Sequence, residues 1–343
     1  MAGARRWTAT VRRCRRARGK LMDSDRLLEY DRLSQRALLQ LDHEHTVAFW
    51  TISPMEVHGP HLPLGTDVDI AQEALRRTAR RWLELHPEDW ALMLPPLPLG
   101  SDVLPLPGSL QVSGSLLERV VVEVGQGLAR AGLRTLVIGN NHGGPRHMLA
   151  LERATRRLRR LTGMVVVNPF GAFLRAMFER RPEVLARIGL PPDSELGGPR
   201  DVHAGAFETS LALAALGEEQ VGPTYRDLPP TAIEPASPVA RTVMRPLAGA
   251  LRRSAPLLGP GAEDAARGLD YAAGLLDWIA LDQVPSYIGP PAEADAQLGQ
   301  RGLDAMAHQT VELLERALAG ENLDEVSKPL LWNIRALARL PIG

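Results

Sequence analysis

The chain has 343 residues, of which 45% are hydrophobic, 23% charged and only 4% aromatic, a composition typical of a globular protein with a large core. Basic and acidic residues are equal at 40 each, but eight of the basic residues and no acidic residue fall within the first twenty positions. The rest of the chain is therefore net negative, which argues against a general nucleic-acid-binding protein because such a protein needs a basic surface.

Residues 1–21 form a basic leader that we expect to be disordered, or to result from a start assigned upstream of Met22. The alternative is a basic arm that binds an acidic partner. The leader holds the single cysteine, Cys14, so the remainder has no thiol for a disulfide, a cysteine-based zinc site or a cysteine nucleophile. No apolar segment follows its paired arginines, as a secretory signal requires, and no apolar run is long enough to cross a bilayer. We expect a cytoplasmic protein with no membrane or nucleic-acid partner.

Strand-like and helical segments alternate along the first half of the chain. Short apolar runs rich in β-forming residues predict buried strands at 46–53, 90–94, 135–138 and 164–167. Apolar residues at helical spacing predict helices at 25–42, 69–85, 113–131 and 148–161. Strands that alternate with amphipathic helices predict an α/β fold with a mostly parallel sheet and helices on both faces.

Beyond residue 216 the pattern loosens. Loops are predicted at 222–238 and 286–291, and helical segments at 240–258, 262–276, 302–319 and 323–340. Nothing resembles a clean linker, so we predict one domain over 22–320. Within it, residues 217–285 are an inserted or elaborated helical region, and residues 321–343 are a C-terminal extension.

The first chemistry-bearing loop, residues 56–67, directly follows the first predicted strand, and ligands of open α/β sheets bind beyond such strand ends. Glu56 and His58 point the same way if the backbone is extended there. The glycines and prolines that follow can turn the chain so that Asp67 returns to the same place, where a carboxylate can bridge two cations. Histidine and carboxylate without thiolate suit Zn²⁺, Mn²⁺ or Fe²⁺. The alternative is that these residues only cap helices and form turns. Four metal-competent side chains within twelve positions make this alternative less favoured.

A second loop, residues 139–144, follows the third predicted strand and contains His142. Glycines permit close approach of the backbone to a ligand, and the N–H groups of Gly143 and Gly144 precede a helix, where an anion can be stabilised. A glycine-rich turn with an incidental histidine is the alternative interpretation.

A third loop, residues 201–210, carries His203 and leads into a helix whose first turn contains Glu208. An acidic residue in a first helical turn is favoured by the helix dipole alone. The residues by themselves therefore support a structural and a functional role of this loop equally.

In this order, the three loops resemble the creatininase (creatinine amidohydrolase) family. The family string E-x-H-G-x-H-L-P-x-x-T-D matches residues 56–67 without a gap, and H-A-G-x-x-E-T-S matches residues 203–210. The family turn Asn-Gly-His-Gly-Gly-Asn corresponds to residues 140–145, and a weaker similarity to its closing Gly-x-Pro segment begins at residue 288. The resemblance covers roughly residues 49–216 and 287–318.

The resemblance implies a three-layer α/β/α sandwich and two divalent metal ions per chain, zinc first, with manganese or iron as alternatives. It also implies a small-molecule amide substrate and a homo-oligomer, which in this family is often a hexamer. Carried over position by position, it assigns the metal ligands to Glu56, His58, Asp67, His142 and Glu208. Asp67 is the bridging ligand, and His203 is a catalytic residue near the substrate.

The sequence departs from the family pattern at one metal-binding position and at two places that are expected to line the substrate. Creatininase proper has a further metal-binding glutamate at the position of Gly144; many family members share this glycine, and we assign the missing ligand to Glu208. The stretch after the second strand, residues 100–109, is shorter and more apolar than in the family. Pro199 and Arg200 stand where creatininase has a tryptophan. Creatinine itself is therefore not the expected substrate.

The expected reaction is hydrolysis of a non-peptide or cyclic amide by a metal-activated hydroxide. His203 would donate a proton to the leaving nitrogen, and Ser101, Gly143 and Gly144 are the expected substrate contacts, with Asn141 as a positioning group. One alternative is a peptidase or deformylase that acts on a modified peptide or a formylamide. An alternative of another class is a non-hydrolytic metal-binding maturation or scaffold protein, whose helices after residue 216 bind a partner.

Overall fold

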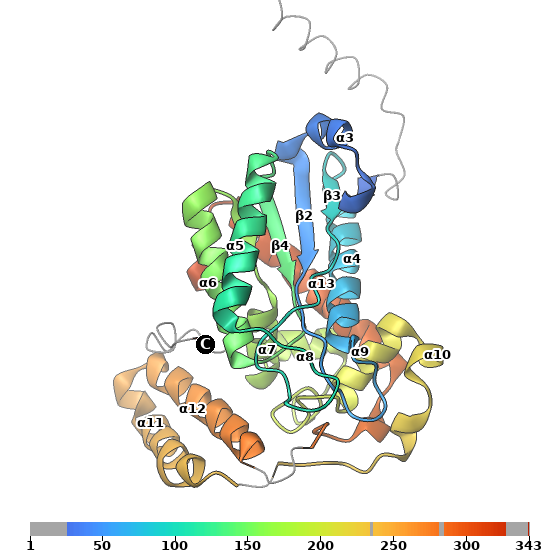
Figure 1. Ribbon diagram of the computed structural model, residues 1–343. Coiled ribbons are helices and arrows are strands. Elements are labelled where there is room, and N and C mark those ends of the chain that lie inside the picture. The colour runs from blue at the N-terminus through green and yellow to red at the C-terminus, as the bar shows by residue number, and fades with distance from the viewer. Residues whose placement is uncertain (1–25, 234–235, 281–284, 327–341, 343) are drawn as a thin grey trace, which may run out of the picture.

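The computed structural model describes residues 26–233, 236–280, 285–326 and 342. The predicted α/β architecture is confirmed, because a five-stranded sheet of order β1-β3-β2-β4-β5 forms the centre and each neighbouring pair is parallel (Figure 1). The strands are β1 (Leu27–Glu29), β2 (Thr46–Thr51), β3 (Trp90–Met93), β4 (Thr135–Gly139) and β5 (Val165–Val167).

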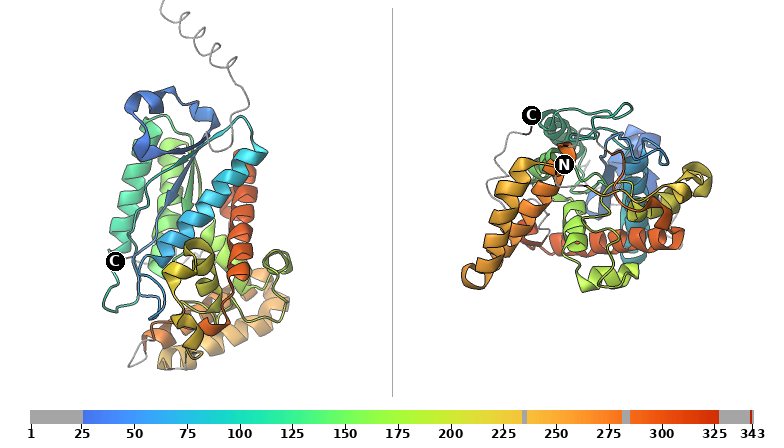
Figure 2. Two further views of the ribbon diagram at one scale, coloured as in Figure 1. Left: turned by 90° about the vertical axis from the view of Figure 1, so that its right-hand side faces the viewer. Right: turned by 90° about the horizontal axis from the view of Figure 1, so that it is seen from below.

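Helices cover both faces of the sheet. One face carries α4 (Thr66–Leu85) and α13 (Ala296–Leu318), and the other carries α5 (Gly114–Arg130) and α6 (Pro145–Thr162), as Figure 2 shows. Alternate residues of β2 enter different cores: Phe49 packs with Trp82 of α4, whereas Trp50 packs with the α5 and α6 side. Both strand faces are buried, which explains why the strands are continuously apolar.

The helix predicted for residues 25–42 is wrong in its first half. Residues Leu27–Glu29 form β1 and pair in parallel with β3, and only α3 (Gln35–Gln40) is helical in the second half. The apolar residues of a three-residue strand are too few to establish a period of two. These residues become extended because β3 would otherwise be an edge strand, and pairing with β1 satisfies its backbone hydrogen-bonding groups.

Several helices begin earlier than predicted, among them α6 (Pro145–Thr162), predicted from residue 148. Helix α4 begins at Thr66 rather than at residue 69, which places Asp67 in its first turn. Helix α13 begins at Ala296 rather than at residue 302, where the side chain of Asp295 accepts hydrogen bonds from the backbone of Gln297 and Leu298. The helix predicted from residue 113 is confirmed as α5, and the Ser113 hydroxyl caps it by accepting a hydrogen bond from the Leu116 N–H.

A third core lies beside the sheet and supports the candidate site. It is formed by α9 (Ala206–Leu216), α13 and two helices that the sequence pattern did not predict, α7 (Phe170–Phe178) and α8 (Pro182–Ile188). Phe207 of α9 packs here with Leu303 of α13. This packing anchors the start of α9.

The region after α9 contains α10 (Glu218–Val221), the 3-10 helix Thr224–Asp227, and the predicted helices α11 (Arg245–Leu258) and α12 (Pro260–Ile279). A π-helical segment, Ala240–Met244, leads directly into α11, so the predicted helix 240–258 is helical throughout. Helices α11 and α12 form a hairpin that projects from the body in Figure 1 and in the right panel of Figure 2. Of the predicted segment 323–340, α14 (Leu323–Val326) is described, and the rest, like the leader 1–21, lies outside the described residues. Among the described residues, no helix is long and apolar enough to cross a membrane.

Candidate metal centre

Three segments far apart in the sequence meet at the carboxyl ends of β2 and β4. One loop follows β2, a second follows β4, and a third leads into α9. In the first loop, the backbone N–H of Glu56 donates to the carbonyl oxygen of Leu64 at 2.9 Å. This bond closes the loop and brings Asp67, in the first turn of α4, back beside Glu56 and His58.

Asp67 belongs to two groups of side chains whose ligand atoms lie within 4.8 Å of one another. One group is Glu56, Asp67 and His142, and the other is His58, Asp67 and Glu208. The Oδ2 atom of Asp67 lies 3.3 Å from Nδ1 of His142, and its Oδ1 atom lies 3.5 Å from Nε2 of His58. The two oxygens of one carboxylate thus face different groups, which is the geometry that a bridging ligand needs. The structure brings all five predicted ligands together, and their role as ligands stays a prediction.

Backbone carbonyls orient the two histidines of these groups. Nδ1 of His58 lies 3.0 Å from the carbonyl oxygen of Glu56, and Nε2 of His142 lies 3.0 Å from that of Ser101. A neutral imidazole that donates one N–H to a carbonyl holds its lone pair on the other nitrogen. These are Nε2 of His58 and Nδ1 of His142, the atoms that face Asp67. Such supporting hydrogen bonds are characteristic of metal-binding histidines.

Strong electrostatic coupling holds the apoprotein cluster together. Burial would lower the pKa of His58, but Asp67 and Glu208 raise it to about 10, and in the same way Glu56 and Asp67 hold the pKa of His142 well above its usual value. Burial would raise the pKa of Glu56, but His142 and His203 lower it to about 2. Burial would also raise the pKa of Asp67, but His58 and His142 hold it far below its usual range. Without a cation, protonated histidines therefore balance the carboxylates.

Two buried carboxylate oxygens indicate that a cation fits here. Oε2 of Glu56 and Oδ2 of Asp67 accept no hydrogen bond of ordinary geometry, although His142 Nδ1 lies 2.9 and 3.3 Å away. A buried carboxylate oxygen without a donor is unfavourable unless a positive charge faces it. The donor set of two imidazoles and three carboxylates suits Zn²⁺ or Mn²⁺. The residues present therefore fit a pair of divalent ions.

Glu208 is held against the first two loops by two donors. The side-chain amide of Asn141 donates to its Oε1 atom at 2.8 Å, and the backbone N–H of Ala204 donates to its Oε2 atom at 2.6 Å. Asn141 also reaches Oδ1 of Asp67 at 3.3 Å. Burial raises the pKa of Glu208 to about 7. The predicted positioning residue Asn141 thus touches the carboxylates rather than standing apart from them.

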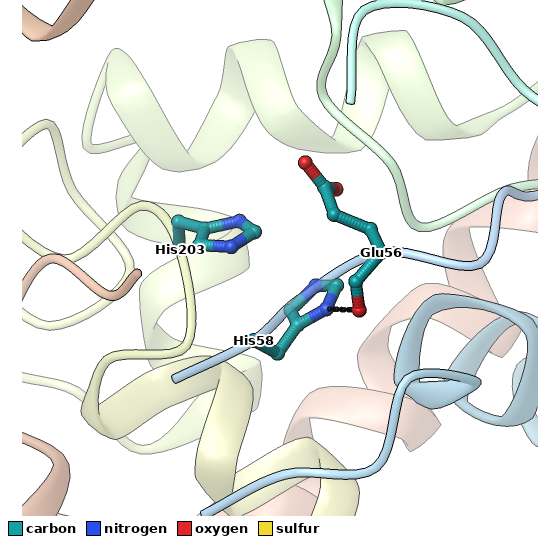
Figure 3. Close-up of side chains that lie close together, drawn as sticks. All are labelled: Glu56, His58 and His203. Atoms are coloured by element: carbon teal, nitrogen blue, oxygen red, sulfur yellow. Dashed lines mark hydrogen bonds between the residues drawn. The ribbon is translucent and has the colours of Figure 1, made fainter. Parts of the chain in front are cut away.

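His203 stacks on the ring of His58 with centroids 4.3 Å apart, and a ligand atom of His203 lies within 4.8 Å of those of Glu56 and His58 (Figure 3). Its Nε2 atom lies 2.8 Å from the carbonyl oxygen of Val57. Burial, and then the charge of His58, lower its pKa to about 4. His203 is therefore a neutral ring at the border of the cluster near neutral pH.

The predicted substrate contacts lie beside His142. The carbonyl of Ser101 accepts from this ring, and a Cβ atom at Gly144 would lie 2.3 Å from His142 Nε2 and 2.9 Å from the Ser101 oxygen. Residue 144 is therefore a glycine because the loop around Ser101 closes over it, and no side chain fits there. The substrate contacts of Ser101, Gly143 and Gly144 stay predictions.

Several supporting residues escaped the sequence analysis. Oδ1 of Asn140 accepts from the Ser53 hydroxyl and from the backbone of His142, and it lies 3.1 Å from Nε2 of His147. His61, a metal candidate by its position in the first loop, instead lies 3.0 Å from the Thr209 hydroxyl and joins none of the metal groups found among the described residues. The available signal at Asn140 was a polar residue two positions before a candidate ligand, but the sequence pattern does not show that Ser53 and His147 are its partners.

Comparison with known proteins adds an independent observation. Residues 31–314 match the family model described as "Creatininase: Creatinine amidohydrolase". A mycofactocin precursor peptide peptidase from Mycobacterium tuberculosis is 36% identical over 110 residues, which are 30% of this chain and 42% of that protein, so the match spans less than half of the relative. The creatinine amidohydrolase of Pseudomonas putida is 29% identical over 172 residues, 48% of this chain and 62% of that protein. A solved structure named "Creatininase Mn" superposes with a TM-score of 0.56 at 20% identity, covering 84% of this chain and 98% of its own.

Proposed function

The chain belongs to the creatininase family, and on that basis we propose that it is a metal-dependent amidohydrolase that uses two divalent ions to cleave a non-peptide or cyclic C–N amide bond. The observation that carries the proposal is the placement of Asp67 between two donor groups, with its buried Oδ2 atom accepting no hydrogen bond of ordinary geometry. Divalent ions bound there would polarise a substrate carbonyl and lower the pKa of a bound water. Zinc or manganese is the proposed metal, with iron as the alternative.

His203 has the placement that a proton carrier needs. Its neutral ring, with Nε2 directed at the Val57 carbonyl, holds a lone pair on Nδ1. It can therefore accept the proton that an attacking water loses and then donate it to the leaving nitrogen, so that no net proton is gained or lost by the ring. General acid–base transfer of this kind contributes roughly 10²–10⁴-fold in rate. Its predicted role as proton donor thus requires a preceding role as acceptor.

A second candidate is a peptidase that acts on a modified peptide. It is favoured by the 36% identity to the mycofactocin precursor peptide peptidase, which exceeds the 29% identity to the creatinine amidohydrolase. The glycine at position 144, where creatininase proper has a metal-binding glutamate, also separates this chain from enzymes that act on creatinine. A small-molecule amide substrate, a cytoplasmic location and a homo-oligomer such as a hexamer stay predictions.

The test compares Asp67→Asn with Asp69→Asn. Both residues lie in the first turn of α4, but only Asp67 belongs to the two donor groups. We expect the wild type and Asp69→Asn to hold two metal ions per chain and to hydrolyse a member of a panel of cyclic ureas, lactams, formamides and modified peptides. Asp67→Asn should lose at least one ion and at least 10²-fold in rate, on the order of the loss of one catalytic group.

The substrate panel separates the alternatives. Turnover of the modified peptides alone would favour the peptidase. Two bound ions with no turnover of any compound would favour a non-hydrolytic metal-binding protein. An Asp67→Asn variant with full metal content and full turnover would refute the proposed centre.

A further inference from the structure

Asp201 is a buried carboxylate that belongs to none of the metal groups found among the described residues. Only 5% of it is exposed, and it lies between α8 and α9. Its Oδ2 atom accepts from the backbone N–H of Gly197 at 2.8 Å and of Phe207 at 2.9 Å. Phe207 is the second residue of α9, whose N-cap residue, Gly205, has no side chain to offer. Asp201 therefore caps this helix from four residues upstream of its N-cap.

Two glycines make room for this carboxylate. A Cβ atom at Gly205 would lie 1.9 Å from Oδ1 of Asp201 and 2.5 Å from the carbonyl oxygen of Ile288. A Cβ atom at Gly289 would lie 2.4 Å from the same Oδ1 atom. Gly205 has a φ of −85°, which any residue adopts, so its side chain is excluded by this contact and not by its backbone conformation. The carboxylate is thus wedged between two backbone segments that have no side chains there.

The segment held by Asp201 contains His203 and leads into the first turn of α9, which contains Glu208. Both His203 and Glu208 belong to the candidate centre. His203 and Ala204 lie between Asp201 and the start of α9, and Ala204 has a φ of 48°, a left-handed conformation that residues with a side chain rarely adopt. In this conformation the N–H of Ala204 donates to Oε2 of Glu208. On the opposite side, the carbonyl oxygen of His203 accepts from Ile288 N–H at 2.7 Å. The hydrogen bonds of Asp201 on one side and of Ile288 on the other hold the backbone of His203 and Ala204 in this conformation.

We propose that Asp201 is a positioning residue that places Glu208 and His203, and that it thereby determines whether a divalent ion is retained at the group of His58, Asp67 and Glu208. The inference rests on the proposed function, because that function supplies the two ions. The inference goes beyond the proposed function because it assigns the retention of one ion to Asp201, which belongs to neither group of ligands.

The other group of ligands has supports of its own. The backbone N–H of Leu104 donates to Oε1 of Glu56 at 2.5 Å, and His142 is held by the Ser101 carbonyl. Neither support involves the loop of Asp201. Removal of the Asp201 carboxylate should therefore weaken one ion selectively, which a general loss of folding would not do.

The experiment measures zinc per chain, by elemental analysis after equilibrium dialysis against micromolar zinc, for the wild type and four variants. Asp201→Ala and Gly205→Ala should retain about one ion instead of two, since the first removes the carboxylate and the second displaces it while leaving it present. Asp201→Asn should retain two, because the amide oxygen still accepts from the Gly197 and Phe207 N–H groups. Asp193→Ala, at an exposed position of the same connection, is the matched control and should also retain two.

The outcomes separate the two proposals. A wild type with fewer than two ions would refute the proposed function itself. A wild type with two ions, together with Gly205→Ala and any folded Asp201→Ala protein that also keep two, would overturn the role of Asp201. If Asp201→Ala does not fold, Gly205→Ala decides the question, and loss of both ions in that variant would equally overturn a selective role.

Discussion

Loading the apoprotein with divalent ions should release protons, and the number follows from the pKa values of the cluster. A metal binds a neutral imidazole and an ionised carboxylate, so each bound proton must leave. At pH 7 His58, with a pKa of about 10, and His142, with a pKa well above its usual value, are both protonated in the apoprotein. Glu208, with a pKa of about 7, is half protonated. We therefore expect about 2.5 protons per chain at pH 7, and about half a proton fewer above the pKa of Glu208, once that carboxyl is ionised in the apoprotein.

The assay is calorimetric titration of the apoprotein with zinc in two buffers of different ionisation enthalpy. The difference in observed heat, divided by the difference in buffer enthalpy, counts the released protons. Each proton released also makes the apparent affinity rise about tenfold per pH unit. His308→Gln, on the partly exposed face of α13, is the control that should leave the count unchanged.

A low count would refute the reasoning. Ionisation of a bound water can only add protons to the number released, so it cannot conceal the effect. Release of fewer than one proton per chain at pH 7, or a zinc affinity that does not change between pH 6 and pH 8, would show that His58 and His142 are already neutral in the apoprotein. The charge balance inferred for the empty cluster would then be wrong.

Two further predictions use glycine positions as matched tests. Gly144→Ala should weaken zinc binding by about 10–100-fold, because its Cβ would lie 2.3 Å from His142 Nε2 and displace this ring from the Ser101 carbonyl. Equilibrium dialysis measures the zinc affinity, and an unchanged affinity would contradict the close packing at this position. Gly127→Ala, in the middle of α5, where the new methyl group would meet only the Arg130 side chain at 3.7 Å, should raise the free energy of unfolding by about 0.5–1 kcal/mol in a urea titration; a loss of stability would show that this helix face is covered.

The sequence by itself determined the alternation of strands and helices and the candidate ligands of the first loop, whereas His142 and Glu208 were assigned through the family resemblance. The alternation and the first-loop ligands are local properties: continuous apolar runs require burial on two faces, and a strand end followed by Glu56 and His58 places two ligand types two residues apart. Even the return of Asp67 could be predicted, since glycines and prolines at fixed positions turn the chain within a few residues.

Only the tertiary structure decided how the three loops support one another. Residues 27–29 become a strand because β3 leaves an open edge, and no pattern within three residues contains that information. Asp67 directs one oxygen to each donor group because α4 starts at Thr66, and Gly144 is a glycine because a loop some forty residues earlier closes over it. Asp201 could have been a coincidental neighbour of His203 until its partners at Gly197 and Phe207 were visible. Packing between distant segments is a property of the folded chain, and it determines which polar residues share a buried site.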